Sequence, residues 1–336
     1  MTATSDPPTT TAEPLPGDDD DAVSVGPGRS GGRSGSADDL APAEPQSLAV
    51  GLVKLARPKQ WIKNSLVFAA PGAAGVLKDI EPVVDSTVAF VAFCMAAAGT
   101  YYINDARDVA ADRLHPKKRF RPVATGAVPV PLAFGLGFAL LVASVGVAYL
   151  VNANLAAVVV AYVCLTTSYS AWLKNIAVVD LVAVAAGFVL RAVAGAEATE
   201  VPISDWFFIV TIFGSLFMVA GKRGAEAAEM GNDARSFRAV LASYRPEYTA
   251  YLRSVTSSAV LVSYCMWAFE KANTSSAGLP WYQASILPFV MAVLRYALVL
   301  DQGKGSAPEE IILGDRILQL IGVMWVVVFG IGVYTA

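Results

Sequence analysis

Long runs of apolar residues, separated by short polar segments, make up most of the chain after about residue 64. A helix needs about 20 mostly apolar residues to cross a bilayer. The pattern predicts nine such helices, the first of which is interrupted by Pro71 and Gly72. The expected fold is all-α, a polytopic membrane protein in which nine transmembrane helices form a bundle. The predicted spans are residues 64–79, 86–104, 131–151, 154–172, 176–195, 206–221, 254–270, 283–300 and 316–335.

Composition divides the chain into two regions. Charged residues make up 16% of the chain, whereas an average soluble domain contains about 25%. Residues 1–48 are acidic, rich in Pro, Gly, Ser and Thr, and without aromatic residues, which is typical of disordered segments. We therefore expect a disordered acidic tail at residues 1–48 and an integral membrane domain at residues 49–336. The lipid bilayer is the expected environment of that domain, and no nucleic-acid partner is expected.

Basic residues indicate how the membrane domain is oriented. If the N-terminus is cytoplasmic, the loops predicted outside contain only Lys78 and Lys271, and the other basic loop residues lie inside. Cytoplasmic loops of membrane proteins carry an excess of Lys and Arg. The sequence therefore predicts a multi-pass protein of the inner (plasma) membrane with a cytoplasmic N-terminus and, after nine spans, a C-terminus outside.

Three aspartates at positions i, i+3 and i+7 follow the second predicted span: Asp105, Asp108 and Asp112. On a continuous helix these positions share one face, where three carboxylates repel one another unless a cation binds. Mg²⁺ prefers oxygen ligands and is usually held by one or two carboxylates together with substrate phosphates. The next segment is strongly basic and could contact phosphate oxygens, although a positive-inside loop explains its two lysines equally well. It contains Arg113, His115, Lys117, Lys118, Arg119 and Arg121.

A second acidic triplet has the same spacing and follows the sixth predicted span: Glu226, Glu229 and Asp233. Both triplets fall on the predicted cytoplasmic side, which favours one shared site for a divalent cation and a diphosphate. A simple helix ion pair between Lys222 and Glu226 is the alternative explanation for part of this motif. Asp233 differs from Glu226 and Glu229, because Gly231 can end their helix before Asp233 is reached.

Three further segments place polar groups near the same membrane face. Arg57–Asn64 opens the first span, Tyr169–Lys174 ends the fourth, and Asp180 lies one turn into the fifth. An acid in a span is expected to face the bundle interior. Arg191 and Arg295 also lie within spans, where pairing with an acid or snorkelling competes with substrate contact.

These motifs resemble those of the UbiA-type intramembrane prenyltransferases over about residues 50–336. The resemblance rests on the nine predicted helices, on Asn104-Asp105-x-x-Asp108-x-x-x-Asp112, on Tyr169-Ser170 with Lys174, and on the second acidic motif. In that family, acidic motifs hold Mg²⁺-bound diphosphate at the cytoplasmic mouth of the bundle, and the isoprenoid chain leaves through a lateral opening. The resemblance thus implies a nine-transmembrane-helix UbiA-like bundle at residues 49–336.

Two segments depart from the aromatic prenyltransferase pattern and look like the decaprenyl-phosphate phosphoribosyltransferase branch. They are Arg57–Asn64 and Asp112–Pro122. The likeness to this branch implies phosphoribosyl pyrophosphate and decaprenyl phosphate as substrates, with decaprenylphosphoryl-5-phosphoribose and diphosphate as products. Such a reaction is a step toward cell-wall arabinan.

The resemblance also implies roles for individual residues. It implies Mg²⁺ as the cofactor, with Asp105, Asp108, Asp112, Glu226 and Glu229 as ligands. It implies a catalytic role, stabilising the leaving diphosphate, for Asp105, Asp108, Asp112, Lys222 and Glu226. It implies substrate contacts for Lys59, Asn64, Asn104, Arg113, Lys117, Arg119, Tyr169, Lys174, Asp180 and Arg223.

Two alternative functions remain at this stage. One is a UbiA-type prenyltransferase that moves a polyprenyl group from its diphosphate to an aromatic acceptor. The other is a secondary transporter, although transporters usually place coupling-ion sites near the bilayer midplane in broken helices. The sequence also leaves a homo-oligomer open.

Overall fold

The structure, a computed structural model, describes residues 47–115, 118–230, 239–274, 280–303 and 308–335 of the 336-residue chain. Residues 45–336 form one compact unit, to which all elements below belong. The predicted disordered tail at residues 1–48 lies outside the described residues except for its last two, so its disorder stays a prediction.

The described residues fold into helices and contain no β-strand. Short 3₁₀ segments join several of them: η2 (Pro58–Phe68), η3 (Val76–Lys78), η4 (Lys118–Phe120), η5 (Leu173–Asn175) and η7 (Ala239–Ser243). The α-helices are α1 (Leu48–Ala56), α2 (Ala69–Ala74), α3 (Ile80–Arg107), α4 (Val109–Leu114), α5 (Val130–Tyr149), α6 (Ala153–Ala171), α7 (Val179–Ala198), α8 (Asp205–Met230), α10 (Pro246–Thr274), α11 (Trp281–Ala284), α12 (Ile286–Asp301), α13 (Pro308–Gly314) and α14 (Arg316–Thr335).

Seven helical segments in the described part of the chain are long and apolar enough to cross a membrane. They are α3, α5, α6, α7, α8, the combined α11 and α12, and α14. The predicted all-α, multi-pass membrane fold is therefore confirmed, but the predicted count of nine spans is not.

The two remaining predicted spans have different local structures. The first, residues 64–79, lies across η2, α2 and η3 rather than in one continuous helix. The other, residues 254–270, lies inside α10, whose 29 residues would extend roughly 43 Å at 1.5 Å per residue. Hydroxyl side chains lower the hydropathy of α10. Several of them donate to the carbonyl four residues earlier, as Ser254, Thr256 and Ser263 do, which satisfies them within an apolar environment.

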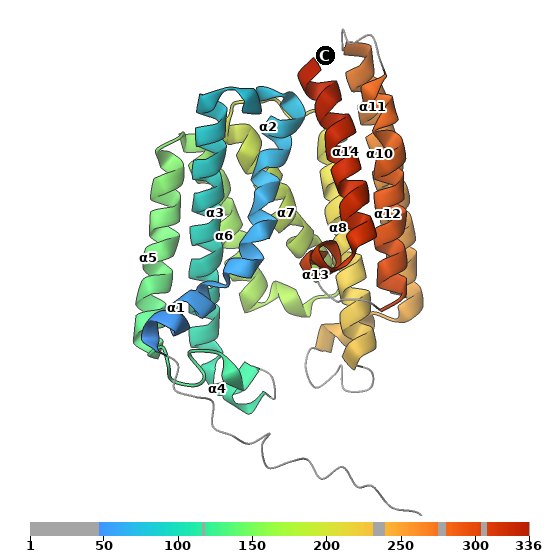
Figure 1. Ribbon diagram of the computed structural model, residues 1–336. Coiled ribbons are helices and arrows are strands. Elements are labelled where there is room, and N and C mark those ends of the chain that lie inside the picture. Colours follow the sequence, from blue (N-terminus) through green and yellow to red (C-terminus); the bar gives the residue numbers. More distant parts are fainter. Residues whose placement is uncertain (1–46, 116–117, 231–238, 275–279, 304–307, 336) are drawn as a thin grey trace, which may run out of the picture. The chain divides into compact units, whose positions relative to one another are not determined.

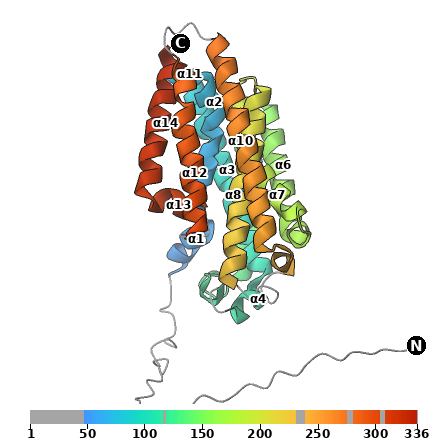
Figure 2. The ribbon, with the colours of Figure 1, turned by 90° about the vertical axis from the view of Figure 1, so that its right-hand side faces the viewer.

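The helices pack in neighbouring pairs. Helix α3 packs on α5, α6 on α7, α8 on α10, and α12 on α14, while α7 also contacts α8. In Figure 1, α7 lies between one group of helices (α3, α5 and α6) and a second group (α8, α10, α12 and α14). Figure 2 shows the same arrangement turned by 90°. The C-terminal ends of α3, α6 and α8 and the N-terminal end of α7 lie at the same end of the bundle, near α4 (Figure 1). This end gathers the polar motifs.

One close backbone contact fixes the segment that precedes α3 against α7. A Cβ atom built on Gly195 would lie 1.7 Å from the carbonyl oxygen of Val67 and 3.2 Å from Cδ of Pro71. Only glycine permits this approach of η2 and α2 to α7. The contact therefore anchors the irregular segment whose first residue follows Arg57.

Replacing this glycine is expected to destabilise the bundle. Gly195→Ala should lower the free energy of unfolding by about 3 kcal/mol or more, because two backbone segments must separate. The measurement is the thermal unfolding midpoint of the purified protein in detergent. Gly135→Ala is the matched control, since nothing lies within 4 Å of its added Cβ. Equal midpoints for the two variants would contradict the close-contact interpretation.

Candidate active site

The first acidic motif lies where α3 ends. Asp105 is in the last turn of α3, Asp108 stands between α3 and α4, and Asp112 is in α4. Asp105 and Asp112 are 2% and 3% exposed, whereas Asp108 is exposed. The expectation of three carboxylates on one continuous helix face is wrong, because the backbone of Asp108 (φ −88°, ψ 5°) leaves the helical conformation.

Two arginines neutralise the two buried carboxylates. Asp105 Oδ1 accepts a hydrogen bond from Arg57 Nη2 at 2.7 Å and another from Arg121 Nη1 at 2.9 Å. The same Arg121 nitrogen donates to Asp112 Oδ2 at 2.8 Å. The side chains of Arg57 and Arg121 are 31% and 27% exposed, so they cover the buried acids on the solvent side. We name this group of four residues the α3–α4 cluster.

The backbone of Arg57 is held in an uncommon conformation. This residue joins α1 to η2 with φ 53° and ψ 59°, in the left-handed region. Few residues other than glycine occupy this region. The guanidinium carbon of Arg57 lies 4.4 Å from the ring centroid of Tyr101, a favourable cation–π arrangement. The turn and the ring together direct the guanidinium toward Asp105.

The second cluster is centred on Arg223 of α8. Its guanidinium donates to Asp180 Oδ2 at 2.9 Å, to Tyr169 Oη at 2.9 Å and to Glu226 at 2.5 Å. Lys222 Nζ lies 3.7 Å from Glu226, so the i, i+4 ion pair considered as an alternative is present. Asp180 is fully buried and Arg223 nearly so. We name these residues the α7–α8 cluster.

Tyr244, which the sequence motifs did not indicate, holds Asp180 from the other side. Its phenol donates to Asp180 Oδ1 and accepts from the backbone N–H of Val178 at 2.7 Å. Burial and the hydrogen bond to Asp180 raise the pKa of Tyr244, so the phenol keeps its proton and stays a donor. Val178 has φ 70° and ψ −46°, a strained conformation for a β-branched residue. Tyr244 is 64 residues from Asp180 in the sequence, so no local sequence pattern connects the two residues.

One hydrogen bond links the segments that carry the two clusters. Asn104, next to Asp105, donates through Nδ2 to Ser170 Oγ at 2.9 Å. Ser170 is adjacent to Tyr169, whose hydroxyl accepts from Arg223. The ends of α3, α6, α7 and α8 therefore lie at one end of the bundle, and a single site shared by the two acidic motifs stays a prediction.

The other predicted substrate residues occupy different environments. Lys59 and Arg119 are exposed, and Lys174 is half-buried in η5. Arg113 donates from Nε to the carbonyl of Ala124 at 3.1 Å. The remaining predictions cannot be placed: Lys117 and Asp233 lie outside the described residues, as does the side chain of Glu229.

Asn64 differs from its predicted role as a substrate contact. It is 1% exposed, and its side chain accepts from Arg191 Nε at 2.7 Å and donates to Cys94 Sγ at 3.2 Å. Arg191 also donates to the carbonyl of Gly187 and to Tyr162 Oη. This geometry supports a structural role for Asn64, which ties η2 to α6 and α7 through a buried guanidinium.

The ability of the carboxylates to hold a divalent cation depends on how many of them converge on one point. Among the described residues, no three acidic, histidine or cysteine side chains are close enough to form a protein-only metal site. The five predicted ligands therefore do not form one such site in the described part. However, Asp105 and Asp112 converge on one positively charged nitrogen of Arg121. Two converging carboxylates suit Mg²⁺, whose remaining ligands are usually water and phosphate oxygens.

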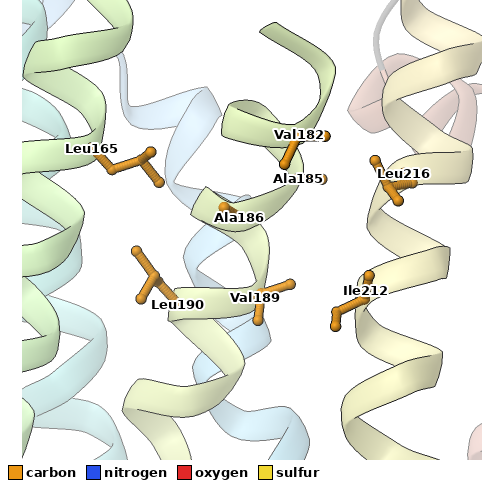
Figure 3. Close-up of a pocket in the computed structure, with 8 residues that line it drawn as sticks. All are labelled: Leu165, Val182, Ala185, Ala186, Val189, Leu190, Ile212 and Leu216. Carbon is orange, nitrogen blue, oxygen red and sulfur yellow. The ribbon is translucent and has the colours of Figure 1, made fainter. Parts of the chain in front are cut away.

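An apolar pocket of about 440 Å³ lies along α7 between α6 and α8. Figure 3 shows Val189 and Val182 of α7 on the side of Ile212 and Leu216, with Leu165 and Leu190 on the other side of α7. The pocket begins within one turn of Asp180 and continues along the membrane-spanning part of α7. Its eight lining residues are Leu165, Val182, Ala185, Ala186, Val189, Leu190, Ile212 and Leu216.

Comparison with known proteins identifies related sequences. The model of the UbiA prenyltransferase family matches residues 65–314. Decaprenyl-phosphate phosphoribosyltransferase of Corynebacterium glutamicum is 43% identical over 294 residues, which cover 86% of this chain and 89% of that protein. The protein of the same description from Mycobacterium tuberculosis is 42% identical over 300 residues, covering 88% and 98%.

Solved structures show the same fold at low sequence identity. A UbiA homolog from Archaeoglobus fulgidus bound to GPP and Mg²⁺ superposes with a TM-score of 0.63 at 18% identity, covering 85% of this chain and 100% of that one. A digeranylgeranylglyceryl phosphate synthase structure gives a TM-score of 0.60 at 15% identity, covering 86% and 99%. The helices described above therefore follow an architecture known from experiment.

The buried pair of Arg223 and Asp180 generates a stability prediction. Arg223→Met should destabilise the protein by about 3 kcal/mol, because an unpaired carboxylate remains in a buried environment. Adding Asp180→Asn to that variant should recover part of the loss. Thermal unfolding in detergent measures both effects.

The partly buried pair of Arg295 and Asp315, joined at 2.6 Å, provides the comparison. Arg295→Met should cost less than Arg223→Met, since the side chains of Arg295 and Asp315 are 23% and 14% exposed, against 4% and 0% for Arg223 and Asp180. If the double variant is less stable than Arg223→Met alone, the charge-pair explanation is wrong.

Proposed function

The chain belongs to the UbiA prenyltransferase family, and we propose that it transfers the 5-phosphoribosyl group of phosphoribosyl pyrophosphate to decaprenyl phosphate. The products are decaprenylphosphoryl-5-phosphoribose and diphosphate, and the lipid product serves cell-wall arabinan synthesis. Relatives described by this activity are more than 40% identical over most of both chains. The geometric observation that carries the proposal is the convergence of Asp105 and Asp112 beside two arginines, a set that suits a metal-bound diphosphate.

Mg²⁺ is the proposed cofactor. Asp105 and Asp112 would hold it, with Asp108 at the exposed mouth and Glu226 and Glu229 on the facing helix α8. The Mg²⁺ in the Archaeoglobus homolog supports this choice. When bound, Mg²⁺ would neutralise the diphosphate and stabilise the charge that builds on it as a leaving group.

The cationic side chains of the site bind and orient phosphate groups. Arg57 and Arg121 lie at the buried acids, and Lys222 lies on the facing helix beside Glu226. Lys59 and Arg119 are exposed cations, and Lys174 is half-buried in η5. Arginine forms bidentate contacts with phosphate, while lysine acts as a compact charge. With the diphosphate fixed, the bond from ribose C1 to diphosphate breaks with its electron pair on the leaving group.

The acceptor needs no strong general base. Its nucleophile is an oxygen of the lipid phosphate, which is already anionic at neutral pH, and that oxygen forms the new bond to ribose C1. This agrees with a chain that contains one histidine. The residues of the chain therefore act mainly by positioning two anionic substrates and by neutralising their mutual repulsion.

The apolar pocket beside α7 is the proposed position of the first isoprene units. Its lining is entirely aliphatic, and it begins close to Asp180, so a phosphate at the polar clusters can be joined to a chain in the pocket. Ten isoprene units exceed its volume, so the remainder of the chain extends into the bilayer.

We also place the site on the cytoplasmic face of the plasma membrane, with the N-terminus on that side and the C-terminus outside. The excess of basic residues on this face follows the positive-inside rule, and phosphoribosyl pyrophosphate is water-soluble. The transferase domain is residues 49–336, and every residue used here belongs to one chain, so no homo-oligomer is required.

The alternatives are less well supported. Both clusters lie at helix ends, whereas transporters place ion sites near the midplane. Prenyl transfer to an aromatic acceptor lacks support from the relatives with high identity, whose description is phosphoribosyl transfer.

The activity itself is the first test. Purified protein with Mg²⁺, radiolabelled phosphoribosyl pyrophosphate and decaprenyl phosphate should yield label that partitions into organic solvent. Asp105→Asn should reduce this rate by about 100-fold or more, since electrostatic stabilisation of the leaving group is lost. Asp79→Asn is the control, because Asp79 is exposed at the opposite end of α3. No organic-soluble label from the unaltered protein would refute phosphoribosyl transfer.

The pocket is tested separately by a substitution that fills part of it. Ala186→Phe should fill part of the pocket, so the KM for decaprenyl phosphate should rise by about tenfold, as expected for losing apolar contact along part of the chain. The KM for phosphoribosyl pyrophosphate should stay unchanged. Val142→Phe, on the exposed side of α5, is the control. Equal KM values for decaprenyl phosphate in all three proteins would exclude the pocket as the binding site.

A further inference from the structure

The buried carboxylates of the α3–α4 cluster accept hydrogen bonds from two guanidinium groups whose side chains are more exposed than they are. Asp105 and Asp112 have side chains 3% and 4% exposed, while those of Arg57 and Arg121 are 31% and 27% exposed. Three charge-assisted hydrogen bonds of 2.7 to 2.9 Å join the four residues. A cation that binds these oxygens must first displace the arginines.

We propose that Arg57 and Arg121 are exchangeable counter-ions that exclude free divalent cations from Asp105 and Asp112. The arginines leave the carboxylates only when the metal arrives together with a diphosphate. This inference rests on the metal-binding role given above to the two aspartates. It adds an order of binding, in which the metal and the diphosphate enter as one complex.

Each charged group keeps a partner of opposite charge during this exchange only when a diphosphate is present. A free metal ion would gain two carboxylates but would leave two guanidinium groups without anionic partners and expel them toward solvent. A metal-bound diphosphate supplies new partners, because phosphate oxygens accept the same bidentate hydrogen bonds as carboxylates. Each guanidinium then exchanges a carboxylate for a phosphate, and each carboxylate exchanges a guanidinium for the metal.

The two arginines are held in a way that suits this exchange. The backbone of Arg57 is fixed in the left-handed region, and its guanidinium lies over Tyr101. The backbone of Arg57 therefore stays in place while rotation about its side-chain bonds moves the guanidinium. Arg121 uses a single nitrogen for both carboxylates, which leaves the rest of its guanidinium available to a second anion.

Arg223 in the α7–α8 cluster is a contrasting case. It is 3% exposed and bound at once to Asp180, Glu226 and Tyr169. Tyr244 holds Asp180 from the far side. A guanidinium enclosed in this way is a fixed structural charge, so the exchange is assigned to Arg57 and Arg121 alone.

The test measures binding of Mn²⁺ alone to the full-length protein in detergent, from the electron paramagnetic resonance signal of free Mn²⁺. Arg121→Gln should bind Mn²⁺ about tenfold more tightly than the unaltered protein, because a competing charge has left both oxygens. Arg57→Gln should shift the affinity in the same direction. In the unaltered protein, added diphosphate should raise Mn²⁺ affinity more than it does in Arg121→Gln.

Arg107→Gln is the matched control for net charge. Arg107 is exposed, lies two residues from Asp105, and makes no ion pair with any described residue. Its removal should change Mn²⁺ affinity by less than about twofold, since solvent screens its charge. If Arg121→Gln proves unstable, Arg57→Gln tests the same exchange, because it leaves Arg121 bridging both acids.

The outcomes separate this inference from the proposed function. Unchanged Mn²⁺ affinity in both Arg121→Gln and Arg57→Gln, beside normal phosphoribosyl transfer by the unaltered protein, would overturn the counter-ion proposal alone. Tighter Mn²⁺ binding in these variants, with no phosphoribosyl transfer by the unaltered protein, would support the exchange and refute the function. If Arg121→Gln and Arg57→Gln changed the Mn²⁺ affinity only as much as Arg107→Gln does, the change would be an effect of net charge. That result would also overturn the counter-ion proposal.

Discussion

The pairing of buried carboxylates with guanidinium groups at the helix ends is the interaction on which the rest of the structure depends. Burying an isolated charge is costly, and an ion pair offsets that cost only when its hydrogen bonds are well made. Asp105 and Asp112 meet this condition through arginines from outside their helices, and Asp180 meets it through Arg223. Each pair also joins elements distant in sequence. The ion pairs that neutralise the buried acids therefore also hold together the helix ends that form the polar end of the bundle.

Two strained turns lie beside these pairs. Positive φ values occur at Arg57, which reaches Asp105, and at Val178, which precedes Asp180 by two residues. Such conformations persist only where surrounding contacts fix them. At Val178 the fixing contact is the phenol of Tyr244, and at Arg57 it is the pair of interactions with Asp105 and Tyr101. Of the three non-glycine residues with positive φ among the described residues, Arg57 and Val178 lie beside the ion pairs, and the third is Glu200.

The polar end and the apolar pocket match the two chemically different parts of a polyprenyl phosphate. Asp180 lies in the first turn of α7, and the aliphatic lining starts at Val182 on the same helix. A single helix therefore passes from an ion-pair cluster to a hydrocarbon surface within one turn. The close contact at Gly195 and the hydrogen bond from the buried Arg191 to Asn64 hold η2 and α2 against α7. These contacts fix the position of the segment beside this transition.

The sequence by itself determined the membrane class, most of the spans and the two acidic motifs. Apolar run length and charge spacing are local properties, so Asp105, Asp112 and Glu226 could be selected without a structure. Only the tertiary structure decided that Asp108 breaks the helix, that Asn64 is a buried support for Arg191, and that Tyr244 holds Asp180. These outcomes depend on which helix ends meet and which charges become buried together. A carboxylate's partner is set by distance in space, and the sequence carries no direct record of that distance.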